Sequence, residues 1–498
     1  MVTAALDRID VINPATGALL AQVATTPAEE VIECVARARR VQPAWRSTSW
    51  SDRKAVLRTI WRRLAAEGDD WAVAIRDEIG KPASEALAGD VIPTLDAARW
   101  TVRHGGGALA SERLGAGHQR LLQIPTARLT HEPVGVIGMI GTWNYPLFLN
   151  ATPILQALAA GNAVVWKPSE LASWTGQRLQ RCLEESGVPT GLVQAVYGGA
   201  DVGRALVAAG IDKGFFTGGV ENGRRVLAAL GERGVPAVAE LSGFDPALVL
   251  PDAPREAMIP TLAWASFLGA GQTCVAIKRV YVVGDPRPWA EDLGSVARSL
   301  RVGNPAESPV DMGPLISESA RNRFDHQIQS ARAQGAQLIE GGAAVPGPGW
   351  FYRPTVLLAE GPEAEKTLAG AFGPVVIVRG VPNPAAAIEA ANSSVYALGA
   401  SVWAKDRRLA RDVAAQLQAG MVTINEAVTP TMHASAPFGG TRASGFGRTH
   451  GVWGLREFTY PRVTYERRPG GFRPQVFPYG VQPVEQALRL YRWLFHRP

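Results

Sequence analysis

In the first fifth of the chain, apolar residues alternate with polar ones in short stretches and recur with helical spacing in longer ones. Asn-Pro and a glycine at residues 13–17 predict a tight turn between two short strands. Residues 27–45 then place Val31, Val35 and Val41 on one helical face. Helical periodicity continues to about residue 100. This part predicts a helix-rich start and carries no pattern typical of catalysis.

Beyond residue 133 the pattern changes to continuous apolar runs that glycines and prolines interrupt. Residues 134–140 predict a buried strand, 147–160 a helix and 163–166 a second strand. Together they form one β-α-β unit, which is right-handed by default. The same stretch carries too many helix breakers to be a membrane span. It therefore predicts a parallel sheet that is buried on both faces.

Polar side chains and glycines follow the ends of the predicted strands. Asn144 follows the first strand, and Lys167 and Glu170 follow the second. Later strands end near Gly199 and the pair Gly218–Gly219, each before a predicted helix. Because ligands bind beyond the carboxyl ends of parallel strands, these residues are expected at one binding edge. Glycine turns before helices offer N–H groups to a phosphate, although a plain strand-to-helix turn is the alternative.

After Gly243 the pattern of strands and helices starts again. Residues 246–250 and 280–283 predict strands, and 260–268 predict a helix that leads to the loop 271–274. A chain of 498 residues is longer than the chains that fold around a single hydrophobic core. The sequence therefore predicts an α/β fold with more than one domain.

An extended arm is predicted between the helix-rich start and the first β-α-β unit. Residues 120–132 alternate polar and apolar side chains, as an extended strand does. Residues 462–465 predict a late strand that pairs with it. An exposed strand often pairs with another subunit, so the arm favours an oligomer, with a plain surface hairpin as the alternative.

Composition indicates a globular protein with a basic end. Hydrophobic residues make up 46% and charged residues 19%, which is ordinary for a globular chain. The net charge is +6, and most of the excess lies after residue 460. Residues 482–495 predict a basic amphipathic helix that packs on its own or a neighbouring subunit, with membrane-surface contact as the alternative. No motif points to a nucleic acid partner.

The three cysteines, Cys34, Cys182 and Cys274, fit neither a disulfide framework nor a zinc site, and no metal site is predicted. Cys34 and Cys182 lie in helical patterns, where they are interpreted as packing residues. The first twenty residues lack the apolar core of a signal peptide. These features predict a reduced, cytoplasmic protein.

Cys274 differs from the other two cysteines because small residues surround it at the end of a long uncharged segment. Glu240 lies 34 residues upstream (274 − 240). We interpret the pair as a covalent nucleophile and its carboxylate base. For each residue alone, a small buried cysteine and a structural acid are the alternatives.

Eight short motifs give the chain a family likeness. They are NPATG at 13–17, TWNYP at 142–146, KPSE at 167–170, FTGG at 216–219, ELSG at 240–243, GQTC at 271–274, FGPV at 372–375 and PFGG at 437–440. With these motifs in this order, the chain resembles the NAD(P)-dependent aldehyde dehydrogenase superfamily as far as about Arg468.

The resemblance implies a Rossmann-like cofactor domain, a catalytic α/β domain and a small β element for homodimer or homotetramer formation. The implied boundaries are 1–116 and 134–242 for the dinucleotide-binding domain, 243–445 for the catalytic domain, 117–133 and 456–468 for the oligomerisation strands, and 469–498 for a basic amphipathic tail.

The resemblance also implies roles for single residues. Cys274 becomes the nucleophile, Glu240 the general base and Asn144 the oxyanion donor. NAD is the expected cofactor, with NADP as the alternative, because Glu170 offers a carboxylate to a ribose hydroxyl. The implied cofactor-binding residues are Trp143, Lys167, Glu170, Gly199, Gly218, Gly219, Leu241 and Phe372.

The residue types agree with the implied chemistry. A thiolate adds to the aldehyde, and the resulting oxyanion expels hydride to the nicotinamide, which leaves a thioester. A carboxylate then activates water to release the acid. The Asn144 amide and the Cys274 N–H are the expected oxyanion donors.

One position departs from the family pattern. Gly370 stands where the family usually carries a glutamate that holds the nicotinamide ribose. We hypothesise a looser nicotinamide end, which a Gly370→Glu exchange would test. A catalytically weakened nucleotide-binding paralogue and an aldehyde dehydrogenase that acylates coenzyme A are the alternative functions.

The substrate is expected to be an apolar or aromatic aldehyde. Tyr145, Phe148, Trp264 and Phe267 lie close to the motifs and predict an apolar tunnel. Lys278 and its neighbour Arg279 follow the thiol loop, so an acidic semialdehyde is the alternative.

Overall fold

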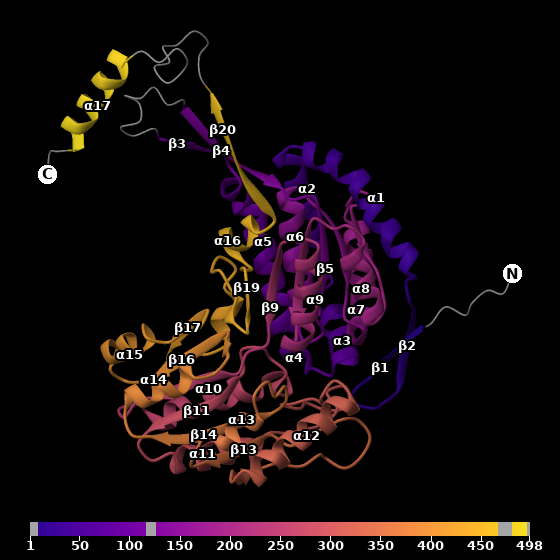
Figure 1. Cartoon of the computed structure of the whole chain (residues 1–498). Helices are drawn as coiled ribbons and strands as arrows, with labels where there is room; N and C mark the ends of the chain where they lie inside the picture. Colours follow the sequence, from indigo (N-terminus) through magenta and orange to yellow (C-terminus); the bar gives the residue numbers. More distant parts are fainter. Residues whose placement is uncertain (1–7, 116–125, 467–480, 496–498) are drawn as a thin grey trace.

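The computed structural model describes residues 8–115, 126–466 and 481–495. Two α/β lobes lie against each other, and a β-stranded arm extends from the first lobe (Figure 1). The predicted α/β class is therefore confirmed. The first seven residues, residues 117–125 of the predicted arm, and residues 469–480 and 496–498 of the predicted tail lie outside the described ranges.

The first lobe is built on a six-stranded sheet with the order β19-β9-β8-β5-β6-β7. All neighbours are parallel except β19, which runs antiparallel to β9. The strands are β5 (Val136–Ile140), β6 (Ala163–Lys167), β7 (Val193–Ala195), β8 (Lys213–Gly218), β9 (Ala237–Leu241) and β19 (Gly445–Phe446). Ile140 pairs with Lys167 and Thr217 with Glu240, so the carboxyl ends of these strands share one edge.

Helices cover both faces of this sheet. Their bounds are α1 (Ala28–Ser47), α2 (Trp50–Ala66), α3 (Gly68–Ile79), α4 (Ala83–Ala86), η1 (Leu87–Val91), α5 (Ile92–Ala108), α6 (Phe148–Ala160), α7 (Ser173–Glu185), α8 (Ala200–Ala208) and α9 (Val220–Glu232). Apolar side chains of α6 are buried on all sides, and Gly161 ends the helix with φ +93. A left-handed residue at this position suits glycine, which agrees with the end predicted at residue 160.

The second lobe holds a seven-stranded sheet with the order β12-β13-β14-β11-β10-β16-β17. Only β12 is antiparallel to its neighbour. The strands are β10 (Asp245–Val249), β11 (Ile277–Val283), β12 (Gln337–Glu340), β13 (Thr355–Ala359), β14 (Val375–Val381), β16 (Gly399–Trp403) and β17 (Met421–Ile424). Its helices are α10 (Arg255–Phe267), α11 (Arg287–Ser299), α12 (Glu318–Ala333), α13 (Glu363–Thr367), α14 (Pro384–Asn392) and α15 (Arg407–Ala414).

The arm is a three-stranded antiparallel sheet with the order β20-β4-β3. Its strands are β3 (Glu112–Leu114), β4 (Thr126–Pro133) and β20 (Thr459–Glu466). The register runs from Thr459 opposite Pro133 to Glu466 opposite Thr126. The predicted pairing of the late strand with the arm is confirmed.

Smaller elements complete the fold. They are the hairpin β1 (Arg8–Ile12) and β2 (Leu19–Ala24), the pair β15 (Tyr396–Ala397) and β18 (Thr441–Arg442), the short helices η3 (Glu170–Ala172), η4 (Leu268–Gly271), η5 (Thr429–Met432) and α16 (Gly451–Arg456), and the C-terminal helix α17 (Val481–Phe495). Leu488, Leu490 and Tyr491 of α17 are exposed. Among the described residues, none of the helices has the length and apolar content needed to cross a membrane.

Candidate active site

The loop that carries Cys274 has an unusual backbone. Gly269, Ala270 and Gly271 of η4 all have positive φ, with values of 60, 53 and 68. A Cβ on Gly271 would lie 2.1 Å from the Gly373 carbonyl oxygen, so a side chain does not fit there. Lys278 Nζ donates to the carbonyl oxygens of Gly271 (2.7 Å) and Gly373 (2.6 Å). This buried lysine therefore fixes the thiol loop against the strand that follows Phe372.

Lys278 and Arg279 do not reach substrate space. Both are buried, at 2% and 1% exposure. Arg279 Nε donates to the Phe244 carbonyl, and its guanidinium lies 3.4 Å from Glu365. Burial lowers the pKa of Lys278 to about 7, while the charge of Asp245 acts against this shift. The two cations are structural parts of the lobe.

Cys274 lies in the wall of two cavities. One has a volume of about 480 Å³ and the other about 360 Å³. Burial raises the pKa of the Cys274 thiol to about 12, and the charges of Asp245 and Glu240 add to the rise. The backbone N–H groups of Val275 and Cys274 hydrogen-bond the sulfur and favour the thiolate. The thiol is therefore protonated at neutral pH until a base or a cation reaches it.

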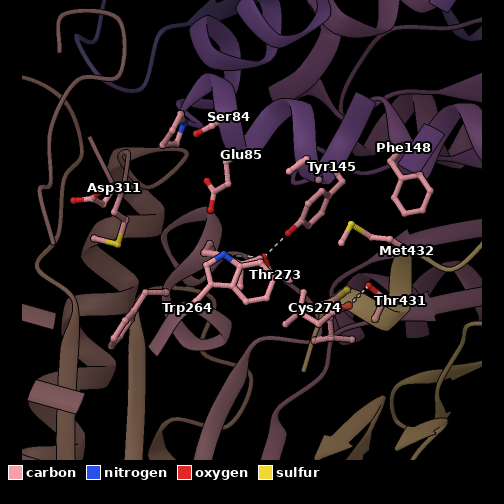
Figure 2. A pocket seen from close by; sticks show the side chains of 18 of the residues that line it. Ser84, Glu85, Tyr145, Phe148, Trp264, Thr273, Cys274, Asp311, Thr431 and Met432 are labelled. Carbon is pink, nitrogen blue, oxygen red and sulfur yellow. Dashed lines mark hydrogen bonds between the residues drawn. The ribbon is translucent and has the colours of Figure 1, made fainter. Parts of the chain in front are cut away.

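The larger cavity, which we name the tunnel, is lined mainly by apolar side chains. Tyr145, Phe148, Trp264 and Phe267, the four aromatic residues predicted for a tunnel, all line it. Figure 2 shows Tyr145 reaching in from one side and Trp264 from the other, with Cys274 beside them. The Tyr145 hydroxyl lies 2.8 Å from Thr273 Oγ1, which fixes that ring next to the thiol loop.

The tunnel also contains acids that the sequence did not indicate. Glu85 Oε1 accepts from the Gly269 N–H at 2.5 Å, and Asp311 forms a two-pronged ion pair with Arg301. Burial raises the pKa of Glu85, while the nearby charge of Lys81 lowers it. Among the described residues, the lining of the tunnel includes neither lysine nor arginine.

The smaller cavity, which we name the cofactor-side cavity, opens at the carboxyl ends of the first sheet. Trp143, Gly218, Gly219, Leu241 and Phe372 line it. The rings of Trp143 and Phe372 meet edge to face with centroids 5.6 Å apart. Gly219 is the N-cap residue before α9, and a Cβ added there would meet nothing within 4 Å, so space alone does not require glycine at this position.

Glu240 lies at the end of β9 and lines the same cavity as Cys274. It is 6% exposed, and neither of its carboxylate oxygens has a hydrogen-bond partner among the described residues. Burial raises the pKa of Glu240 well above its usual value, although the charge of Arg448 lowers it. Gly439 leaves room for the carboxylate, because a Cβ there would lie 2.8 Å from Oε1.

Asn144 connects the two lobes at the thiol loop. Thr142 Oγ1 donates to Asn144 Oδ1 at 3.0 Å, which orients the amide. Asn144 Nδ2 donates to the Gln272 carbonyl at 3.1 Å. An amide nitrogen carries two protons, so one donor remains for a group in the cavity beside Cys274.

Three of the predicted cofactor residues lie outside this cavity, at the far end of the same sheet edge. Lys167 Nζ donates to the Gly198 carbonyl (2.7 Å) and to Glu170 Oε2 (3.1 Å). The Glu170 side chain is 50% exposed. Gly199 begins α8. The structure thus divides the predicted cofactor residues into a set beside Cys274 and a set at the exposed end of β6 and β7.

Gly370 lines the cofactor-side cavity, but its backbone does not suit the residue that it replaces. It has φ +75, and a Cβ there would lie 2.6 Å from the Tyr396 hydroxyl. A Gly370→Glu exchange would therefore disturb the fold as well as the cavity. That exchange is no clean test of a lost cofactor contact.

Two further residues at the site were not indicated by any sequence pattern. His450 is 3% exposed, lines both cavities, and has φ 62. Thr152 of α6 lines the cofactor-side cavity. Cys34 and Cys182 are buried in the first lobe, as predicted. Among the described residues, no group of three His, Cys, Asp or Glu side chains could hold a metal ion.

Comparison with known proteins assigns this arrangement to a family. The family model described as "Aldehyde dehydrogenase family" matches residues 1–464. The chain is 35% identical to a Mycolicibacterium smegmatis protein whose name proposes succinate-semialdehyde dehydrogenase activity with NADP(+), over 95% of this chain and 93% of that one. It is 34% identical to benzaldehyde dehydrogenase [NAD(+)] of Pseudomonas putida, over 93% and 94% of the two chains.

Comparison with solved structures gives the same family. The crystal structure of Mycobacterium tuberculosis aldehyde dehydrogenase complexed with NAD+ superimposes with a TM-score of 0.88 at 30% identity. The comparison covers 94% of this chain and 96% of that one.

Proposed function

The chain belongs to the aldehyde dehydrogenase family, and from this membership we propose that it oxidises an apolar or aromatic aldehyde to the carboxylic acid through a thioester on Cys274. The enzyme class is NAD(P)-dependent aldehyde dehydrogenase. One observation carries the proposal: Cys274 is shared by an apolar tunnel and by a cavity at the carboxyl ends of the first sheet.

The first chemical step is addition of the thiol to the aldehyde. The Cys274 thiol is protonated, since its pKa is about 12, so a base must take the proton as the C–S bond forms. Among the described residues, Glu240 is the only carboxylate that lines the cofactor-side cavity, and its oxygens are unpartnered. The raised pKa of Glu240 makes it a stronger base once it is ionised.

The oxyanion that forms needs donors. The second N–H of the Asn144 amide and the backbone N–H of Cys274 can supply them. Loss of one such donor typically costs about 3 kcal/mol of barrier. After the thioester has formed, Glu240 releases the thiol proton to solvent. In the second half of the reaction, Glu240 takes a proton from water as the water oxygen bonds to the thioester carbon. The C–S bond then breaks with its electron pair on sulfur, which takes the proton back from Glu240.

The residues around the cofactor-side cavity suit a dinucleotide. Trp143 and Phe372 offer aromatic faces, and the N–H groups before α8 and α9 offer donors to phosphate. Lys167 and Glu170 offer a cation and a carboxylate to the adenosine ribose. The dinucleotide supplies the hydride acceptor. We favour NAD over NADP because the Glu170 carboxylate would repel a 2′-phosphate.

The tunnel lining supports the substrate class. Five aromatic side chains line the tunnel, namely Tyr145, Phe148, Trp264, Phe267 and Phe438, and among the described residues its lining offers neither lysine nor arginine to a negatively charged substrate. An acidic semialdehyde would leave its carboxylate unpaired in an apolar wall, which costs several kcal/mol. Benzaldehyde, the aldehyde in the name of the Pseudomonas putida relative, fits the proposed class better than succinate semialdehyde does.

NADH absorbance with an aldehyde panel tests the proposal. Benzaldehyde and medium-chain alkanals should give kcat/KM values well above that of succinate semialdehyde, with a carboxylic acid as the product in water. Faster turnover with coenzyme A would favour the acylating alternative. NAD binding without NADH formation for any aldehyde would favour the weakened paralogue and contradict the proposal.

We further propose a cytoplasmic homodimer or homotetramer. All three cysteines are free thiols, and the proposed mechanism needs Cys274 reduced. The arm offers strand edges that another subunit can cover.

A further inference from the structure

Several residues that line the cofactor-side cavity carry buried polar atoms with no hydrogen-bond partner among the described residues. These atoms are both carboxylate oxygens of Glu240, Oγ1 of Thr152 and Nδ1 of His450. Buried polar atoms are almost always hydrogen-bonded, to protein or to ordered water. A group of such atoms around one cavity therefore indicates a place for water.

His450 occupies a special position in this group. Of the titratable side chains that line the two cavities, only those of Cys274 and His450 line both. The imidazole lies between two phenyl rings, with centroid distances of 5.1 Å to Phe148 and 6.0 Å to Phe438. Burial lowers the pKa of His450 to about 4, so the ring is neutral at physiological pH. The neutral ring can hydrogen-bond water but does not carry the second proton of an imidazolium.

The fold brings the other two groups to either side of this ring. Phe148 and Thr152 are four residues apart on α6 and therefore share one helical face. On the other side, Phe438 and Thr449 exchange two backbone hydrogen bonds of 2.9 and 2.8 Å, which fixes His450 against the chain that follows Phe438. The next residue, Gly439, makes room for Glu240 Oε1.

The backbone of His450 is held in an uncommon conformation. Its φ is 62 and its ψ is 159, a region that non-glycine residues rarely adopt. Such a conformation is strained and persists where the surrounding structure requires it. Here the strain directs the imidazole into the wall between the tunnel and the cofactor-side cavity.

We propose that His450 and Thr152, together with Glu240, hold the water that hydrolyses the acyl enzyme. The inference rests on the proposed thioester at Cys274. One proton of this water passes to the Glu240 carboxylate as the water oxygen bonds to the thioester carbonyl carbon. The C–S bond then breaks, its electron pair stays on sulfur, and the proton on Glu240 returns to the sulfur. His450 and Thr152 are positioning residues that orient the water and are not proton carriers.

The test separates formation of the acyl enzyme from its hydrolysis. His450→Leu and Thr152→Val remove the hydrogen-bonding atoms and keep similar volume. In stopped flow with benzaldehyde and NAD+, each variant should form one NADH per active site at the rate of the wild type. Steady-state turnover should then be about tenfold slower, because one hydrogen bond to the water is lost. Hydroxylamine, which cleaves thioesters without an activated water, should restore turnover.

Conservative and matched variants complete the experiment. His450→Gln and Thr152→Ser keep a hydrogen-bonding group and should recover most of the steady-state rate. Thr101→Val is the matched control, because the buried Thr101 hydroxyl on α5 already donates to the Ala97 carbonyl of the same helix. In Thr101→Val, formation of the first NADH and steady-state turnover should both proceed at the rates of the wild type.

Two outcomes overturn the inference. In one, the first NADH and the steady-state rate fall by the same factor in both variants. In the other, hydroxylamine leaves the slow rate unchanged. If His450→Leu does not fold, Thr152→Val decides alone. A wild-type protein that forms no NADH contradicts the proposed function instead, so the two failures are distinguishable.

Discussion

At the scale of single residues, burial determines the chemistry of the site. The thiol of Cys274, the carboxyl of Glu240 and the imidazole of His450 all have pKa values shifted toward their neutral forms, with burial as the largest cause. A site of neutral groups around two cavities is suited to a reaction in which charge appears only when substrate and cofactor are bound.

The shifted thiol predicts the pH dependence of alkylation. Below the pKa of about 12, the thiolate fraction of Cys274 rises with pH, so the rate of modification by iodoacetamide should rise about tenfold per pH unit between pH 7 and 10. NAD+ should accelerate the reaction, because a nearby positive charge favours the thiolate. Cys274→Ala is the control. A rate that levels off below pH 8 would show that the thiolate already forms in the free enzyme.

Gly370 predicts a backbone effect. Gly370→Ala should lower the free energy of unfolding by about 1–3 kcal/mol, because φ is +75 and the new Cβ meets the Tyr396 hydroxyl. Urea denaturation measures the change. Tyr396→Phe removes the hydroxyl, so the double variant should recover part of the loss. An alanine variant as stable as the wild type would contradict this account of the position.

At the scale of elements, the joint between α3 and α7 depends on one buried acid. Glu78 accepts hydrogen bonds from the Trp174 N–H (2.7 Å), the Thr175 N–H (2.8 Å) and the Thr175 hydroxyl. Burial nevertheless raises the pKa of Glu78 to about 7. Its neutral form is therefore favoured in the folded protein.

This shift predicts a pH-dependent stability. The contribution of Glu78 is fully present below about pH 4.5, the usual glutamate pKa, and is lost as pH rises through about 7. Glu78→Gln is neutral throughout, so the variant should gain stability relative to the wild type between pH 5 and 8. Urea midpoints at the two pH values measure this gain. Parallel changes in both proteins would refute it.

Elements are also the level at which sequence patterns predict best. Apolar runs between glycines predicted β5, α6 and β6 because local residues determine where such elements begin and end. The start of α10 was placed too late, at Pro260, whereas the helix begins at Arg255. Pro260 is exposed, so the carbonyl that it leaves unpaired can bond to water within the helix.

The site was predictable only where its motifs are local. Cys274 and Glu240 each belong to a short contiguous motif, which can be recognised from the sequence alone. His450 lies 176 residues after Cys274 (450 − 274), and it reaches the site only because β19 returns the chain to the first sheet. Nothing near Thr449 and His450 in the sequence indicates that contact.

At the scale of the whole molecule, the arm is the surface that we propose for assembly. It is made of β20, β4 and β3, and Tyr460, Val463 and Tyr465 of its outer strand are exposed. Figure 1 shows the arm standing away from both lobes. An exposed strand with apolar side chains is a surface that another subunit can cover.

Charge on this strand should weaken the assembly. The wild type is expected to sediment as a dimer or tetramer, and the double exchange Val463→Lys and Tyr465→Lys should shift it to smaller species. Sedimentation velocity measures this shift. Arg128→Lys on β4, which keeps the charge, serves as the control. A wild type that sediments as a monomer would rule out this role for the arm.

The central claim is that Cys274 becomes acylated during turnover, and peptide mass spectrometry tests it most directly. The enzyme is quenched in acid during turnover of benzaldehyde with NAD+, digested and mapped. The account predicts a benzoyl group on the Cys274 peptide. Acylation of Cys34 or Cys182 alone, or turnover that survives in Cys274→Ala, would contradict it.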